Sequence, residues 1–301
     1  MVLTKKILLT YLLSIISFFC LAQNGMLVFQ TDFGLKDGAV AAMKGVAMKV
    51  SGNLKIFDLT HEIPAFNIWE AAYRLQQTAS YWPEGTVFVS VVDPGVGSER
   101  KSIVLETKSG HYFVTPDNGT LTLIASSLGV REIRVIDEKI NRLPGSSESY
   151  TFHGRDVFAY TGARLASKKI SFQQIGPVMN EKLVMINYRP PVIASNMISG
   201  NIEVLDPQYG NVWTNISDSL VRRLSFRYGD SLHVEIYEKE VQKFSGAMPF
   251  VQTFAGVPEQ HNLAYLNSLL NFSFAINKGN FAAKYGIGSG PDWKVVVRKN
   301  N

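Results

Sequence analysis

Four short polar segments carry the residues of this 301-residue chain that are best suited to chemistry. Each follows or borders an apolar run, and in open α/β sheets ligands bind at the carboxyl ends of strands. Histidine and carboxylate side chains are the usual general acids and bases of enzymes, so these segments are candidates for catalysis. The segments are residues 31–34 (TDFG), 93–100 (DPGVGSER), 116–119 (PDNG) and 152–156 (FHGRD).

Each segment also has a purely structural interpretation. Asp-Pro-Gly and Asp-Asn-Gly are typical of turns, because glycine reaches positive φ and Asx side chains cap turns. Asp156 suits the first turn of a helix, where the helix dipole favours a carboxylate. Each of the five histidines, taken alone, is more often a buried residue with satisfied hydrogen bonds than a catalyst.

Several chemistries are excluded by motifs that the sequence lacks. It has no His-Glu-x-x-His and no other histidine pair at ligand spacing, so we predict no metal. Gly95-Val96-Gly97 lacks the third glycine of a dinucleotide fingerprint, and neither a Walker motif nor a Gly-x-Ser-x-Gly elbow occurs. The one cysteine, Cys20, lies in a segment that we expect to be removed, which leaves no thiol for disulfides, nucleophilic catalysis or metal binding.

Residues 1–22 are predicted to be a secretory signal peptide. Two lysines precede an uncharged apolar run that ends in Cys-Leu-Ala, with small residues at the −3 and −1 positions of a cleavage site. Two phenylalanines stand where small residues normally precede a lipidated cysteine, which argues against a lipid anchor on Cys20. We therefore expect an exported protein, periplasmic or secreted. Its net charge of +5 includes both lysines and is too weak to argue for a nucleic-acid partner.

The apolar pattern divides the remaining chain into two domains. Up to about residue 166, β-rich runs alternate with helical patterns, which is typical of a largely parallel sheet covered by helices. Pro190 and Pro191 interrupt this alternation, and mostly strands follow. The fold class is therefore α/β, with an N-terminal α/β domain over residues 23–190 and a β-rich domain over residues 191–301. The strands expected in the second domain are 198–205, 231–237, 250–254, 269–276 and 294–298, with a helix at 218–224.

Taken together, the polar segments resemble those of the S-adenosyl-L-methionine (SAM) hydroxide adenosyltransferase family, SAM hydrolases related to the SAM-dependent chlorinase and fluorinase. The resemblance covers about residues 27–297. It implies a smaller β-barrel-like second domain, and a homotrimer with nucleoside sites between the first domain of one subunit and the second domain of its neighbour. Six stretches carry it, in order: TDFGLKDGAVAAMKG, DLTHEIPAFNIWEAA, GTVFVSVVDPGVGSERKSI, VTPDNGTLTLI, TFHGRDVFA and DPQYGNVWTNI.

The resemblance also implies the site residues. The aspartate, arginine and histidine that orient and activate water in the hydrolases fall on Asp93, Arg100 and His153. The ribose-binding aspartate falls on Asp32, and the ring that stacks on adenine falls on Tyr209. The other substrate contacts fall on Asn211, Ser268, Ser273 and Ile276.

Two positions depart from the family pattern, which opens the way to altered substrate choice. Ser273 replaces the usual glutamate, and Tyr160 stands where the family often has proline.

The implied reaction is hydrolysis of SAM, in which water attacks C5′ of the ribose and releases adenosine and L-methionine. The leaving thioether is neutral, so the step needs no acid, metal or other cofactor. Asp32 and Asp93 would orient the ribose. His153, with Asp93 and Arg100, would polarise or deprotonate the water, a contribution of typically ~10²–10⁴-fold.

Three alternatives remain beside the hydrolase. SAM is made and used in the cytoplasm, so an exported chain would also fit a SAM- or adenosine-binding protein without turnover. A SAM-dependent halogenase is disfavoured, because that branch has serine at the position of Gly154 and lacks the trio. A purely structural secreted protein leaves the coincidence of the polar segments unexplained.

Overall fold

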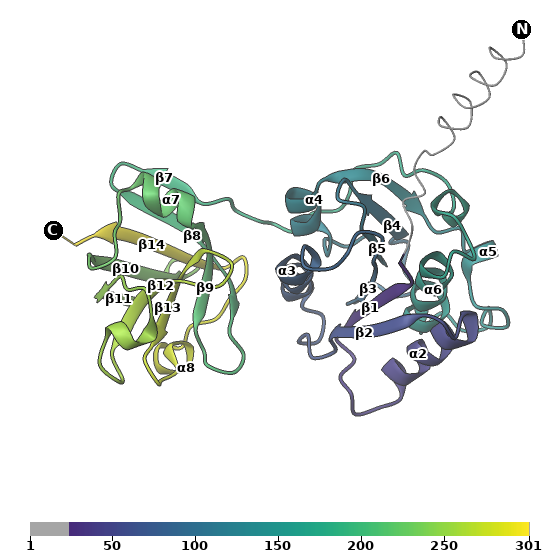
Figure 1. Cartoon of the computed structure of the whole chain (residues 1–301), viewed down its shortest axis with the longest axis horizontal. Helices are drawn as coiled ribbons and strands as arrows, with labels where there is room; N and C mark the ends of the chain where they lie inside the picture. Colours follow the sequence, from purple (N-terminus) through teal and green to yellow (C-terminus); the bar gives the residue numbers. More distant parts are fainter. Residues whose placement is uncertain (1–23, 301) are drawn as a thin grey trace, which may run out of the picture.

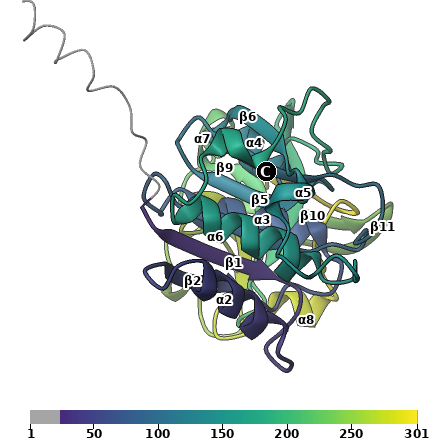
Figure 2. The same ribbon diagram turned by 90° about the vertical axis from the view of Figure 1, so that its right-hand side faces the viewer.

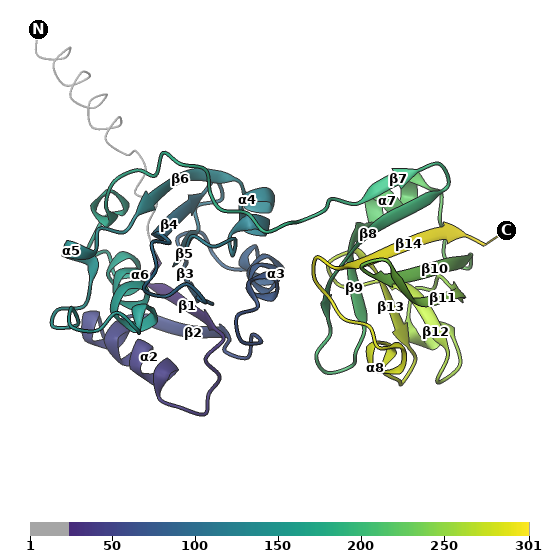
Figure 3. The ribbon, with the colours of Figure 1, turned by 180° about the vertical axis from the view of Figure 1, so that it is seen from behind.

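The computed structural model describes residues 24–300, which form two domains joined by residues 176–191 (Figures 1 and 3). The predicted signal peptide lies outside the described residues. Within residues 24–300, no helix combines the length and apolar character that crossing a membrane requires.

The first domain is built on a six-stranded sheet with the strand order β2-β1-β3-β5-β4-β6. The pairs β1–β2, β1–β3 and β3–β5 are parallel, whereas β4 pairs antiparallel with both β5 and β6. The prediction of an α/β domain with a largely parallel sheet is confirmed. The strands are β1 (Met26–Thr31), β2 (Lys55–Thr60), β3 (Val87–Val91), β4 (Ser102–Thr107), β5 (Tyr112–Pro116) and β6 (Val130–Val135).

Helices cover both faces of this sheet. Leu27 and Phe29 of β1 face one layer of helices, and Val28, between them, faces the other, because successive strand residues point to opposite sides. Figure 2 shows α2 and α6 in front of β1, on the first of these faces. The helical elements are α2 (Ala39–Val50), α3 (Ile68–Ala79), α4 (Thr122–Leu128), α5 (Glu138–Asn141), the π-helical turn η1 (Gly154–Ala159), α6 (Tyr160–Ala166) and the 3₁₀ turn η2 (Phe172–Ile175).

The second domain is an antiparallel, nearly closed barrel of eight strands, as the family resemblance implied. The strand order is β11-β10-β14-β8-β9-β13-β12, with β7 paired to β8. A bridge between Phe250 and Ala264 draws the two ends of the sheet together. The elements are β7 (Val192–Ala194), β8 (Met197–Leu205), β9 (Val212–Ser217), α7 (Asp218–Arg223), β10 (Ser231–Glu238), β11 (Val241–Pro249), η3 (Phe254–Gly256), β12 (Asn262–Leu266), β13 (Asn271–Ile276), α8 (Phe281–Tyr285) and β14 (Trp293–Lys299).

The strand expected at residues 250–254 is wrong. The strand β11 lies earlier and ends at Pro249, whereas Phe250 makes only the isolated bridge and η3 begins at Phe254. The sequence also did not indicate β9, because two of its buried residues are polar. Thr214 Oγ1 donates to the carbonyl of Phe272 (2.6 Å), and Asn215 Oδ1 accepts from the backbone of β8. Hydrogen bonds therefore allow polar residues in the barrel interior, which hides the strand pattern.

The two domains meet where α3 packs against β8. Trp69 Nε1 donates to the carbonyl of Glu203 (2.7 Å), and Arg74 Nη2 donates to the carbonyl of Leu205 (3.3 Å). Beside them, Tyr73 packs in an apolar cluster with Val204. The acceptors for Trp69 and Arg74 are backbone groups of β8, while the side chain of Val204 supplies apolar contact with Tyr73.

The segment between the domains is fastened to the first domain before it reaches the barrel. The backbone N–H of Val184 donates to Asp117 Oδ1 (3.0 Å), and that of Ile186 donates to Thr122 Oγ1 (2.8 Å). Burial raises the pKa of Asp117, and the bond from Val184 opposes this change. The polar segment at residues 116–119 therefore has a structural role here.

Candidate active site

Asp93, Arg100 and His153 meet at the carboxyl edge of the parallel strands. Arg100 Nε donates to Asp93 Oδ1 (2.9 Å) and Oδ2 (3.1 Å), and its Nη2 donates to Oδ2 (2.5 Å). The same Nη2 lies 2.9 Å from His153 Nδ1, and Nη1 donates to Ser102 Oγ (2.9 Å). The structure therefore brings together three residues that are 7 and 53 positions apart in the chain.

This cluster is buried and held from several sides. The side chains of Asp93 and Arg100 are 5% and 10% exposed, and His153 is buried. The guanidinium of Arg100 lies 5.3 Å from the centre of the Phe158 ring. Charge-assisted, bidentate pairs of this kind are among the strongest hydrogen bonds in proteins. The guanidinium of Arg100 is consequently held in place against Asp93, Ser102 and His153.

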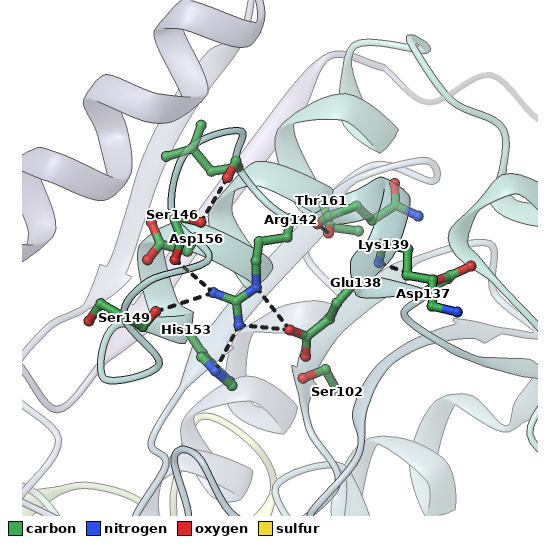
Figure 4. A network of polar contacts seen from close by, with 12 residues as sticks. Ser102, Asp137, Glu138, Lys139, Arg142, Ser146, Ser149, His153, Asp156 and Thr161 are labelled. Carbon is green, nitrogen blue, oxygen red and sulfur yellow. Dashed lines mark hydrogen bonds and ion pairs between the residues drawn. The ribbon is translucent and has the colours of Figure 1, made fainter.

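His153 also faces a residue that the sequence did not single out. Its Nε2 lies 3.0 Å from Nη2 of Arg142, which is paired with Glu138 at 2.7 Å (Figure 4). Burial lowers the pKa of His153, and Arg100 and Arg142 lower it further, while Glu138 and Asp93 oppose them. The imidazole is therefore neutral at pH 7 and suited to accept a proton. No motif marks Arg142, because a Glu-x-x-x-Arg pair occurs on many helix surfaces.

The loop after β1 lies against the start of the π-helical turn. The half-buried Asp32 accepts through Oδ2 from the backbone N–H of Phe66 (2.9 Å). A Cβ on Gly154 would lie 3.1 Å from the ring of Phe33 and 3.3 Å from that of Phe152. Asp32 therefore follows β1 at the edge of the sheet where Asp93 follows β3. π-Helical turns such as η1 are frequent at functional sites.

His61 is a buried residue with satisfied hydrogen bonds, which is the role expected of a histidine taken alone. Thr31 Oγ1 accepts from the backbone N–H of Phe33 (3.2 Å), so its proton is available to His61 Nδ1 (2.8 Å). The other ring nitrogen, Nε2, faces Asp58 Oδ1 at 3.0 Å. Burial raises the pKa of Asp58, but the stronger combined influence of Lys44 and His61 lowers it overall. This chain of bonds fixes the loop that carries Asp32.

The second domain contains a cavity of about 840 Å³ whose lining includes four of the predicted substrate contacts, Tyr209, Asn211, Ser268 and Ile276. The Tyr209 ring is 63% exposed, so one face is free to stack on a planar ligand. Aromatic rings and amides in one cavity suit a nucleobase, which offers a flat π-face and several polar edge atoms. The other lining residues are Asp206, Gln208, Trp213, Phe254, Tyr265, Asn267, Asn277, Lys278, Gly279 and Asn280.

A tight turn presents Tyr209 to this cavity. Asp206 Oδ1 accepts from the backbone N–H of Gln208 (3.1 Å) and of Tyr209 (3.3 Å). Gly210 has φ +66°, and a Cβ there would overlap Asn280 Oδ1. Glycine is therefore required for the turn on both counts.

Ser273 is not brought together with the other predicted contacts. It lies in β13, is fully buried and donates through Oγ to the carbonyl of Asn271 (3.1 Å). Its side chain is not part of the cavity lining. A serine at this position satisfies its hydroxyl locally, which a longer glutamate side chain would not do in the same way.

Asn267 is a cavity residue that the sequence did not indicate. Its Oδ1 accepts from the backbone N–H groups of Leu269 (2.9 Å) and Asn271 (3.1 Å), whereas its buried Nδ2 finds no partner among residues 24–300. A buried N–H without a partner is rare, so a ligand acceptor is its natural complement. Its only sequence signal was its position next to Ser268. Among the residues that the structure describes, no three His, Cys, Asp or Glu side chains gather closely enough to hold a metal ion.

This fold, with a carboxylate–guanidinium–imidazole cluster in one domain and an aromatic cavity in the other, is that of a known protein family. The chain belongs to the SAM hydroxide adenosyltransferase family. The N-terminal domain of that family matches residues 27–176, and its C-terminal domain matches residues 200–294.

The chain is similar to characterised relatives and to a solved structure. It is 40% identical to the (R)-S-adenosyl-L-methionine hydrolase of Methanocaldococcus jannaschii, over 71% of this chain and 74% of the relative. It is 26% identical to the fluorinase of Nocardia brasiliensis, over 91% of this chain and 98% of the relative. The crystal structure of an uncharacterized conserved protein from Thermotoga maritima superimposes with a TM-score of 0.81 at 32% identity, over 90% of this chain and 99% of that protein.

Proposed function

We propose that this protein is an enzyme that hydrolyses SAM to adenosine and L-methionine. Water attacks C5′ of the ribose, the C5′–S bond breaks, and its electron pair leaves with the methionine sulfur. The observation that carries the proposal is the buried contact of Arg100 with both Asp93 and His153. A relative named as a SAM hydrolase at 40% identity supports the same reaction.

Within this reaction, His153 takes the proton of the attacking water. The pKa of His153 is lowered, so the ring is neutral and able to accept it. A positioned general base contributes typically ~10²–10⁴-fold to a rate. Arg100 stays protonated and stabilises the developing hydroxide, and Asp93 fixes the guanidinium through its two oxygens. No metal or cofactor is needed, because the leaving thioether is neutral.

The ligand-binding residues lie in two domains, which supports a homotrimer with shared sites. Asp32 lines a hollow of the first domain, while Tyr209 and Asn211 line the cavity of the second. We propose that Asp32 binds the ribose, that Tyr209 stacks on adenine, and that these residues come from neighbouring subunits.

Mixing two inactive variants tests the shared site. His153→Ala chains refolded together with Asn211→Ala chains are expected to regain activity, since some sites then combine two intact halves. Sedimentation of the mature chain gives the oligomeric state independently. A monomer, or an absence of complementation in a confirmed trimer, rules out shared sites.

Gly154 favours water over halide as the nucleophile. Halide binding needs a donor in a small dehydrated pocket, and the related halogenases have a serine hydroxyl at this position. Here the rings of Phe33 and Phe152 already crowd the Cβ position of Gly154, so a serine would require both to move.

Incubation of the mature chain with SAM, with and without chloride, tests the function. Adenosine and methionine in equal amounts are expected under both conditions, and chromatography separates adenosine from 5′-chloroadenosine. The R and S epimers at sulfur are tested separately, since the archaeal relative is named for the R form. Formation of 5′-chloroadenosine would establish a halogenase, and tight calorimetric binding without methionine release would establish a binding protein.

We also propose that residues 1–22 direct export of the enzyme. SAM or a related 5′-substituted adenosine would then be cleared outside the cytoplasm. Fractionation of expressing cells tests this, with mature protein in the periplasm or medium as the expected result.

A further inference from the structure

His153 lies between two arginines, and only Arg100 belongs to the predicted trio. Nη2 of Arg100 lies 2.9 Å from Nδ1 of the ring. On the other side, Nη2 of Arg142 lies 3.0 Å from Nε2, the contact drawn in Figure 4. Both ring nitrogens therefore face a guanidinium group.

Arg142 is itself held firmly. Its Nε and Nη2 donate to Glu138 Oε2 at 3.1 and 2.7 Å, and its Nη1 lies 3.5 Å from the carbonyls of Ser146 and Ser149 (Figure 4). The guanidinium stands 4.5 Å from the centre of the Tyr150 ring, and the side chain is only 8% exposed. Arg142 is therefore fixed against the ring edge rather than free in solvent.

The hydrogen-bonding capacity of the groups limits the states of the ring. A guanidinium only donates, a neutral imidazole has one lone pair, and an imidazolium has none. The neutral ring thus accepts from one arginine at a time, whereas a protonated ring would direct an N–H group at each of them. The geometry selects the neutral form.

The charges around His153 balance one another, since the two arginines lower its pKa and the two carboxylates raise it. The charged groups that act on the ring are Asp93 after β3, Arg100 before β4, and Glu138 and Arg142 of the α5 region. They form two ion pairs, Asp93–Arg100 and Glu138–Arg142. A net positive charge therefore arises in the cluster only when His153 binds a proton.

We propose that Arg142, held by Glu138, is a positioning residue for hydrolysis, which keeps His153 neutral and its ring fixed as the acceptor for the attacking water. This inference rests on the proposed function. One nitrogen of His153 holds the lone pair and accepts a hydrogen bond from an arginine. As water attacks C5′, this arginine gives up its hydrogen bond, and the nitrogen takes a proton from the water. The electron pair of the C5′–S bond leaves with sulfur, so charges and protons balance.

Histidine NMR tests the coupling without any turnover. The mature chain is labelled with ¹³C,¹⁵N-histidine, and the His153 signal is assigned by its loss in His153→Ala. In Arg142→Gln, the pKa of His153 is expected to rise by about one pH unit, because a cation is removed and Glu138 is left unpaired. Arg142→Lys keeps the charge and should restore most of the wild-type value. The matched control is Arg222→Gln, which breaks an exposed Arg–Asp pair of the same i,i+4 spacing and should leave His153 unchanged.

For a second variant, we expect the pKa of His153 to change in the opposite direction. Glu138→Gln removes the nearest opposing carboxylate, so the pKa of His153 should fall below its wild-type value. This arm remains available if Arg142→Gln does not fold. An unchanged His153 pKa in either folded variant overturns the inference.

Kinetics separate positioning from a merely structural role. In Arg142→Gln, the acid limb of the kcat/KM profile for adenosine release should move upward by the same amount as the NMR pKa. A uniform loss of activity at every pH, with the limb unmoved, overturns the inference. If the wild-type chain releases no adenosine, the proposed function fails on that result, while the NMR arms still decide whether Arg142 controls His153.

Discussion

Arg100 is the residue on which the cluster depends, because it contacts both Asp93 and His153 and also Ser102. It has five donors in a rigid plane, which lets one side chain orient a carboxylate and an imidazole together. The proton itself, in the proposed reaction, goes to His153. The ring proposed to stack on adenine and the amides beside it line the cavity of the other domain, whereas Asp32, proposed to bind the ribose, lies in the same domain as His153.

His153→Ala should abolish most turnover while leaving adenosine binding intact. The expected loss in kcat is ~10²–10⁴-fold, the usual contribution of a general base. Single-turnover release of methionine measures the chemistry, and calorimetry with adenosine measures binding. His233→Ala, a change on the barrel strand β10, is the control and should keep full activity. Wild-type rates in His153→Ala would remove His153 from the mechanism.

Asn267→Asp should weaken adenosine binding by about tenfold, because one hydrogen bond from a buried donor is lost. The substitution keeps Oδ1, which accepts from the backbone of Leu269 and Asn271, and replaces only the unpartnered Nδ2. Calorimetric titration with adenosine measures the change. Affinity equal to that of wild type would mean that Nδ2 does not reach the ligand.

At the scale of elements, the packing of α6 on β3 depends on one glycine. A Cβ on Gly162 would lie 2.5 Å from Val89 Cγ2, which is closer than real side chains approach. Gly162→Ala should lower the free energy of unfolding by about 1–3 kcal/mol, the usual effect of overpacking a core. Urea denaturation measures it.

In the matched control, we expect the free energy of unfolding to change in the opposite direction. Gly45 lies in α2 with open space around its Cβ position, so Gly45→Ala should raise the free energy of unfolding by about 0.5–1 kcal/mol. Equal effects of the two substitutions would show that helix propensity, and not the contact with Val89, decides the result.

The sequence predicted elements well where burial is apolar and periodic. The alternation of β-rich runs and helical patterns up to about residue 166 predicted the α/β domain, in which β1 and α3 show these two patterns. In the barrel the sequence indicated β8, β10, β13 and β14 but missed β9, where Thr214 and Asn215 are buried through hydrogen bonds that only the folded sheet supplies. The grouping of Asp93, Arg100 and His153 was implied by the resemblance to the family, and the structure places the three side chains in contact. Arg142 was not implied, because its meeting with His153 depends on how the chain after α5 folds back.

At the scale of the whole molecule, an acid is buried where the domains meet. Glu203 lies on β8, and Tyr188 Oη donates to its Oε1 (3.2 Å) while accepting from Asn215 Nδ2 (3.2 Å). Burial raises the pKa of Glu203 to about 7, which the bond from Tyr188 partly opposes. The folded chain therefore holds this proton more tightly than the unfolded chain, whose glutamates titrate near 4.5.

The stability of the wild-type protein should consequently fall as pH rises from about 4.5 to about 7, through this group. Glu203→Gln removes the ionisation and keeps the acceptor for Tyr188. It should be more stable than wild type at pH 8 by roughly 1–3 kcal/mol, with no difference at pH 4. Urea denaturation at both pH values measures this, with the exposed Glu240→Gln as control. A difference that is the same at pH 4 and pH 8 would assign the effect to packing instead.

The way in which the segment between the domains is attached has a consequence for recombination between related genes. It is tied to the first domain through Asp117 and Thr122, and α3 meets β8 through the backbone carbonyls of Glu203 and Leu205. A recombination breakpoint at Pro190 therefore cuts none of the bonds that tie the segment to the first domain. An incoming barrel would supply backbone carbonyls for Trp69 and Arg74, but it would also need Glu203 and Asn215 to keep the bonds of Tyr188 and of the Arg189 carbonyl. Under the proposed function, a hybrid between relatives would take Asp32 and the Asp93–Arg100–His153 cluster from one parent and the barrel cavity from the other, so the two halves of the site are free to diversify separately.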